Sequence, residues 1–161
     1  KQFIVCQTGS LIKSVFQVGQ FDISSVKMMK KIAVDNGLLL KEHNCDYLSN
    51  EQIELRSDHG IDAINIAPEL GVIQTNLTFN VSKKLKLEKE LNLFQKLVLK
   101  KGKWKKWNYN NENNLIKFYS AGHYHFSSKL YKNLLNKINH KLNFQKLLNK
   151  SIEKNLIKYF N

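Results

Sequence analysis

The chain has little proline, arginine or cysteine, and it contains no long apolar run. Its 161 residues include one proline, so no Pro- or Gly-rich linker divides the chain. No window approaches the roughly 18 consecutive apolar residues of a membrane span, so we expect no membrane partner. The two cysteines, Cys6 and Cys45, form neither a CxxC pair nor a disulfide framework. Two free thiols are typical of a protein from a reducing cytoplasm, and we expect that location.

Acidic residues are scarce in the second half of the chain. The formal net charge is +13, yet residues 1–76 carry seven basic and nine acidic residues and are nearly neutral. Residues 77–161 carry nineteen lysines and four acidic residues. A nucleic-acid binder usually uses the bidentate arginine fork, and Arg56 is the only arginine. Because the lysines are mixed with many Asn, Ile and Leu, we interpret the charge as AT-rich codon bias and do not expect a nucleic-acid partner.

The first half of the sequence alternates strands and helices. Short apolar strands are predicted at residues 3–6, from residue 38, and at 61–66. A helix capped by Asp22 and stopped at Asn36-Gly37 lies between the first two. A second helix, with a capping box at Ser49 and Gln52, precedes the third. This order predicts parallel βα units, although the pattern does not distinguish a barrel from a doubly wound sheet.

The second half reads as mainly helical. The apolar stripe predicts a long helix over residues 82–101, which Gly102 ends. Residues 115–120 suit a fourth strand or a helix, and helices are expected from Ser128 and over 144–161. We therefore expect one α/β domain at residues 1–140 and a helical Lys/Asn-rich tail at 141–161. The chain is too short for a complete (β/α)8 barrel of about 250 residues, and its start at a strand suggests a piece of a longer protein.

Polar residues follow each predicted strand, where parallel βα proteins build their sites. If the second strand continues, alternation puts Glu42, Asn44 and Asp46 on one face and His43, Cys45 and Tyr47 on the other. Carboxylates beside histidine can act as acid and base or bind sugar hydroxyls, but His43 and Asp46 can equally form a structural pair. The candidate catalytic residues are Glu42, Asp46 and Glu69, and the candidate substrate-binding residues are Gln7, Asn44, Tyr47 and Asn65.

Two further patterns are less specific. On a strand, His123 and His125 would share a face and, with His43 or Glu69, could bind a divalent metal such as zinc or manganese. A lone HxH is more often structural. Trp104, Trp107 and Tyr109 alternate with lysines, which suits a carbohydrate or nucleic-acid surface, but we favour an amphipathic packing segment. The sequence contains no P-loop, GxGxxG or GxSxG motif.

Several segments together resemble one family. Residues 4–9 (IVCQTG), 41–49 (KEHNCDYLS) and 58–70 (DHGIDAINIAPEL) are similar, in order and spacing, to motifs of the accessory, non-catalytic subunit of class II D-tagatose-1,6-bisphosphate aldolase. Residues 102–106 (GKWKK) look like a later element of that family. The chain departs from the pattern at Asn44, Glu69 and His125.

The resemblance implies a function in carbohydrate metabolism, in galactitol degradation. It implies the C-terminal part of a cytoplasmic (β/α)8 TIM-type barrel that binds a ketose (bis)phosphate and supports a separate catalytic aldolase subunit. Related barrels are metal-dependent epimerases of sugar phosphates or uronates. The alternative is therefore an epimerase acting on its own, with His43 and His123 or His125 as metal ligands and Glu42, Asp46 or Glu69 as acid and base.

Overall fold

The structure is an α/β protein, here a computed structural model that describes residues 2–109 and 111–160. The chain separates into two compact units. The sheet unit comprises Lys1–Ala67 and Lys158–Asn161, and the helical unit comprises Pro68–Ile157. The boundary between the units thus lies at Pro68, whereas the sequence suggested a division near residue 140.

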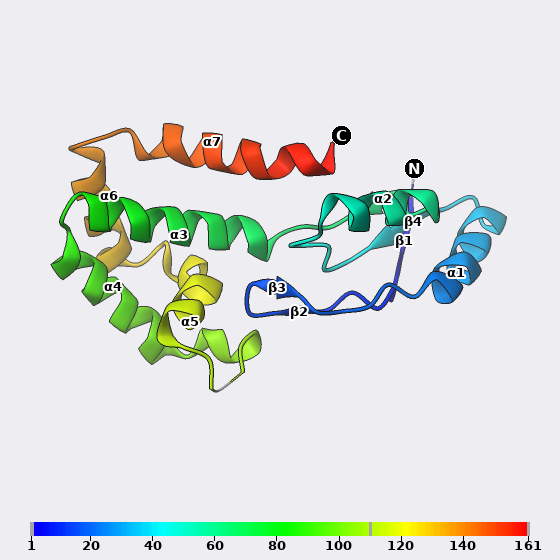
Figure 1. The fold of residues 1–161 in the computed structure, drawn as a ribbon, viewed down its shortest axis with the longest axis horizontal. Coiled ribbons are helices and arrows are strands. Elements are labelled where there is room, and N and C mark those ends of the chain that lie inside the picture. The colour runs from blue at the N-terminus through cyan, green and yellow to red at the C-terminus, as the bar shows by residue number, and fades with distance from the viewer. Residues whose placement is uncertain (1, 110, 161) are drawn as a thin grey trace. The chain divides into compact units, whose positions relative to one another are not determined.

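The sheet unit is built around three parallel strands in the order β1-β4-β5. In register, Cys6 pairs with Glu42, and Glu42 pairs with Ile64. A short antiparallel hairpin follows β1, and helices α1 and α2 connect the parallel strands as predicted (Figure 1). The bounds are β1 Phe3–Cys6, β2 Ile12–Lys13, β3 Phe16–Gln17, α1 Ile23–Asp35, β4 Leu39–Glu42, α2 Asn50–Asp58 and β5 Ala63–Ile64.

Local capping signals fix both helices of the sheet unit. The Asp22 carboxylate accepts hydrogen bonds from the backbone N–H groups of Ser24 and Ser25 at the start of α1. The Ser49–Gln52 capping box is present at the start of α2. Gly37 has φ +65°, a left-handed conformation that glycine adopts without strain. The predicted caps and the predicted helix stop are therefore confirmed.

The two faces of the parallel sheet are covered unequally. Cys6 and Leu40 pack with α1 residues Val26 and Ala33 in a small apolar cluster. Phe3 and Val5 point to the other face of β1, and each is 48% exposed. Parallel sheets are normally covered on both faces, so this face of the sheet unit is open to solvent.

The helical unit is formed by five α-helices and short 3₁₀ turns, and its described residues include no strand. Helix α7 lies beside α3 (Figure 1). Phe94 and Phe118 pack edge to face at 5.5 Å in a continuous apolar core. The bounds are α3 Pro68–Lys84, α4 Glu88–Lys101, η1 Lys103–Lys106, α5 Asn114–Ala121, η2 Gly122–His125, α6 Lys129–Asn139, α7 Phe144–Leu156 and η3 Ile157–Tyr159.

Residues 115–120 lie in helix α5, which is one of the two alternatives predicted for them. The second half differs from expectation in two places. The predicted helix 82–101 is two helices, because α3 ends at Lys84 and α4 begins at Glu88. The predicted tail is not a separate extension, since Phe144 and Leu148 of α7 belong to the core of the helical unit.

The described residues form three parallel strands and no closed barrel. Among them, no helix combines the length and the hydropathy needed to cross a bilayer. Gly102 is left-handed at φ +67° and ends α4, as predicted.

Candidate functional site

The carboxyl ends of β1, β4 and β5 lie at one edge of the parallel sheet, and most of the predicted site residues gather there. The two faces of the sheet differ at this edge. One face carries a buried polar network centred on Glu42. The other carries side chains that are open to solvent.

Glu42 is a buried structural carboxylate. It is fully buried, and its Oε2 atom lies 2.8 Å from Nε of Arg56 on α2. Arg56 Nη2 donates to Glu42 Oε1 at 3.2 Å, so the guanidinium fork holds both carboxylate oxygens. The hydroxyls of Thr8 and Ser10 also donate to Oε1. With four donors around it, Glu42 is not accessible to substrate, which argues against the predicted acid–base role.

Arg56 is fixed from several sides. Its Nη1 donates to the backbone oxygen of Gln52 at 2.9 Å, and its Cζ lies 4.5 Å from the ring centroid of Phe21. The guanidinium therefore cannot swing away from Glu42 without losing a hydrogen bond and an aromatic contact. The network ties β1, β4 and α2 together.

Asp46 is a second structural carboxylate. It is 1% exposed, and its Oδ1 accepts a hydrogen bond from the backbone N–H of Ala67 at 2.9 Å. The strand ends at Glu42, and Asn44 and Tyr47 have φ of +60° and +62°. The alternation predicted for residues 42–47 is therefore wrong, because a left-handed residue breaks the two-residue period.

Gln17 of the hairpin orders the loop that contains Asp46, a role that no sequence pattern indicated. Its Nε2 donates to the backbone oxygens of Asn44 at 2.7 Å and Asp46 at 3.3 Å. Its Oε1 accepts from the N–H groups of Leu11 and Gly19. Asn44 is exposed and Tyr47 is half-buried in this loop.

The open face of the sheet carries the accessible polar groups. Alternation puts Lys41 of β4 on this face, and its Nζ lies 5.8 Å from the ring centroid of Phe3. His43 is exposed just beyond the strand, and its Nε2 lies 3.4 Å from Nδ2 of Asn65. Gln7 is exposed at the end of β1. Lys41 was missed, although the Lys-x-His spacing at the end of a strand could have identified it.

The remaining predicted residues belong to the helical unit. Glu69 is 5% exposed in the first turn of α3 and accepts a hydrogen bond from Asn155 Nδ2 at 2.7 Å. His123 and His125 lie in the 3₁₀ turn η2, so the strand geometry assumed for a metal pair is wrong. Burial lowers the pKa of both imidazoles.

No candidate metal centre emerges among the described residues, since no group of three His, Cys, Asp or Glu side chains converges there. Cys45 is fully buried, with its Sγ 3.8 Å from the backbone oxygen of His43. Burial and the negative charge of Glu42 raise the pKa of the Cys45 thiol well above its usual value. A buried neutral thiol is a poor nucleophile and a poor metal ligand.

The aromatic and basic segment packs rather than forming a stacking surface. Trp104 contacts the core of the helical unit, and Lys117 Nζ lies 4.4 Å from its ring centroid. Trp107 Nε1 donates to the Tyr124 hydroxyl at 2.9 Å. Tyr109 is 56% exposed.

No protein-family model matches the chain, and a comparison with curated proteins finds no match either.

Proposed function

We propose that the protein is an accessory subunit that binds a ketose (bis)phosphate at the carboxyl edge of the β1-β4-β5 sheet and supports a separate catalytic class II aldolase subunit. In this proposal the sheet unit is a section of a (β/α)8-type barrel in carbohydrate metabolism. The open face with Phe3 and Val5 supports a barrel section, because the inner face of a barrel strand packs only against other strands.

One observation carries the proposal: the predicted acid–base carboxylates are used structurally, whereas the exposed polar groups are cationic or neutral. Glu42 is held by Arg56, and Asp46 by the N–H of Ala67. Lys41, His43 and Asn65 remain on the open face. An ammonium group, an imidazole and an amide can bind phosphate and hydroxyl groups.

The same observation disfavours the alternative, an epimerase acting on its own. In that alternative the acid and base are carboxylates, which must lie within hydrogen-bond reach of the substrate carbon acid. Neither Glu42 nor Asp46 has a free face toward the solvent. The epimerase alternative differs experimentally because it requires turnover by this protein without a partner.

The first experiment measures binding and turnover by the protein alone. We expect a ketose 1,6-bisphosphate to shift the His43 imidazole NMR signals and to bind without being converted, with or without zinc or manganese. Lys41→Met and His43→Ala should each weaken binding about tenfold, because each removes a charged or polar contact to the ligand. Lys31→Met, which removes an exposed lysine of α1, and His140→Ala, which removes an exposed histidine of the helical unit, should leave binding unchanged.

The second experiment co-expresses the protein with a class II aldolase catalytic subunit and measures cleavage of tagatose 1,6-bisphosphate. We expect higher activity or a longer half-life of the aldolase in the presence of the protein. Metal-dependent epimerisation by the protein alone, abolished by His43→Ala, would establish the enzyme instead. Absence of both ligand binding and aldolase support would refute the proposal.

A further inference from the structure

The charge of the protein belongs to one unit. The helical unit carries eighteen lysines and five acidic residues, whereas the sheet unit carries eight basic and eight acidic residues. The whole net charge of +13 is therefore on the helical unit. Codon bias alone would raise lysine in both units, so the asymmetry calls for a reason specific to the helical unit.

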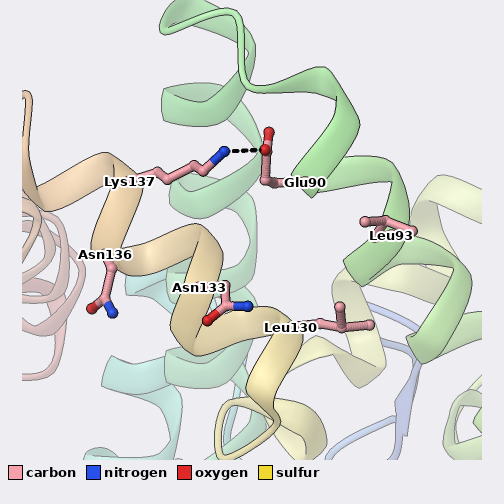
Figure 2. Close-up of a pocket in the computed structure, with 6 residues that line it drawn as sticks. All are labelled: Glu90, Leu93, Leu130, Asn133, Asn136 and Lys137. Carbon is pink, nitrogen blue, oxygen red and sulfur yellow. Dashed lines mark hydrogen bonds and ion pairs between the residues drawn. The ribbon is translucent and has the colours of Figure 1, made fainter.

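Two grooves of the helical unit differ in how their charges are balanced. The groove between α4 and α6 encloses about 320 Å³ and is crossed by the ion pair between Lys137 and Glu90 (Figure 2). Leu93 and Leu130 also line this groove, as Figure 2 shows. Its lysine is therefore already neutralised within the protein.

The groove formed by α3, α4 and α5 has no such balance. It encloses about 390 Å³ and is lined by Lys83 of α3 and Lys96 of α4, and none of its described lining residues is acidic. Both lysines are exposed, and no described carboxylate forms an ion pair with either. Leu99 and Leu115 also line this groove, and Leu115 is 37% exposed.

We infer that the α3-α4-α5 groove binds an acidic amphipathic helix of a partner protein. Leucine-type side chains of that helix would contact Leu99 and Leu115, and flanking glutamates would reach Lys83 and Lys96. Because Lys83 lies on α3 and Lys96 on α4, a ligand that reaches both lysines needs carboxylates at two separate positions beside its apolar stripe. An amphipathic helix has this arrangement. This inference does not depend on the proposed sugar-phosphate site.

Nucleic acid fits the groove less well. A phosphodiester backbone would pair with the two lysines but would place negative charge against Leu99 and Leu115. The one aromatic ring in the groove, Phe79, is half-buried and packs edge to face on Tyr119 at 5.7 Å. It therefore offers little surface for base stacking. The only arginine, Arg56, is buried in the sheet unit.

The test uses three fluorescent probes and the complete chain. The first is a peptide of about 18 residues with a leucine stripe flanked by glutamates, long enough for several helical turns. The second has glutamine in place of every glutamate, and the third is a single-stranded DNA whose charge matches that of the first. Binding is followed by fluorescence anisotropy, and circular dichroism checks that each variant is folded.

We expect the acidic peptide to bind best and the double variant Lys83→Glu, Lys96→Glu to weaken it about tenfold. The control Lys146→Glu, Lys150→Glu makes the same charge change on α7 and should alter binding by no more than about twofold. Leu115→Ser should weaken binding of the acidic peptide but not binding of the DNA. Failure of the acidic peptide to bind, equal losses in both double variants, or tighter binding of the DNA would overturn the inference.

Discussion

The sheet unit and the helical unit are stabilised in different ways. The sheet unit has a small apolar cluster of four buried residues and a buried ion pair, Glu42–Arg56, beside it. The helical unit has a continuous apolar core that includes Phe94, Phe118 and Tyr131. The unit that depends on a polar network also holds the accessible polar site. The unit with the larger apolar core carries the net charge.

The chain supplies a separate probe for each unit, so the comparison can be tested directly. Both tryptophans, Trp104 and Trp107, lie in the helical unit, and both cysteines, Cys6 and Cys45, are buried in the sheet unit. Tryptophan fluorescence therefore reports unfolding of the helical unit, and the reaction of the thiols with a chromogenic disulfide reports unfolding of the sheet unit. If the units are independent, mutations should shift one signal and leave the other in place.

Phe94→Ala should cause the largest loss of stability. Phe94 is fully buried and contacts the rings of Phe118 and Tyr131, at 5.5 and 5.1 Å between centroids. Truncation should lower the free energy of unfolding of the helical unit by about 3–5 kcal/mol. The urea midpoint of tryptophan fluorescence should fall, and thiol reactivity should not change. A parallel shift of both signals would show that the units unfold together.

Arg56→Met tests the buried pair of the sheet unit. Methionine keeps much of the side-chain volume but leaves the Glu42 carboxylate buried without its cationic partner. The free energy of unfolding of the sheet unit should fall by about 3 kcal/mol. The thiols should therefore react at a lower urea concentration. The matched control is Lys30→Met, which breaks the partly exposed pair with Asp62 and should change stability by less than about 1 kcal/mol. Equal effects of the two variants would mean that burial of the pair is not important.

Gly122→Ala tests the closest packing in the helical unit. A Cβ atom at Gly122 would lie 2.4 Å from Cγ2 of Thr75 on α3, so the turn η2 would have to move away. The free energy of unfolding of the helical unit, followed by tryptophan fluorescence, should fall by about 2 kcal/mol. Gly37→Ala is the control for backbone conformation alone, because no atom lies within 4 Å of its Cβ position. That variant should lower the free energy of unfolding of the sheet unit, read from thiol reactivity, by about 1 kcal/mol.

Some of the fold followed from local sequence signals, and α3 shows where such signals were missing. The caps at Asp22 and Ser49 were predicted because each side chain bonds backbone within three residues. Helix α3 was largely missed because its buried face is polar. Thr75 and Thr78 are fully buried, and their hydroxyls donate to the carbonyls of residues 71 and 74, so the expected apolar stripe is absent.

The sequence predicted that the candidate residues follow the parallel strands, but not the contacts that these residues make. The sheet edge was identified because each parallel strand ends in polar residues. The sequence could not show that Glu42 bonds Thr8, Ser10 and Arg56, which lie 34, 32 and 14 residues away. Nor could it show that residues 44 and 47 are left-handed, which ends the alternation. Contacts that depend on tertiary packing decided which carboxylates remain available to a ligand.

The smallest expected effect is a loss of stability in acid that is confined to the helical unit. The imidazole of His123 lies against Gly71, with its ring centroid 4.1 Å from that of Tyr124. Its Nδ1 and the Nε2 of His125 are buried, and no described residue bonds either atom. Desolvation lowers the pKa of both imidazoles; the charge of His125 adds to the effect on His123, and those of Lys101 and Lys103 to the effect on His125.

The sign of the pH dependence follows from these lowered pKa values. Above the unfolded pKa of about 6.5, both states hold neutral imidazoles and the stability is complete. As the pH falls below 6.5 toward the lower pKa of the folded state, the unfolded state binds more protons than the folded state and stability is lost. The urea midpoint of tryptophan fluorescence should therefore drop below pH 6.5, and His123→Phe should reduce the drop, whereas His140→Phe at an exposed position should not. A drop of equal size in both variants would assign the acid sensitivity to groups other than His123.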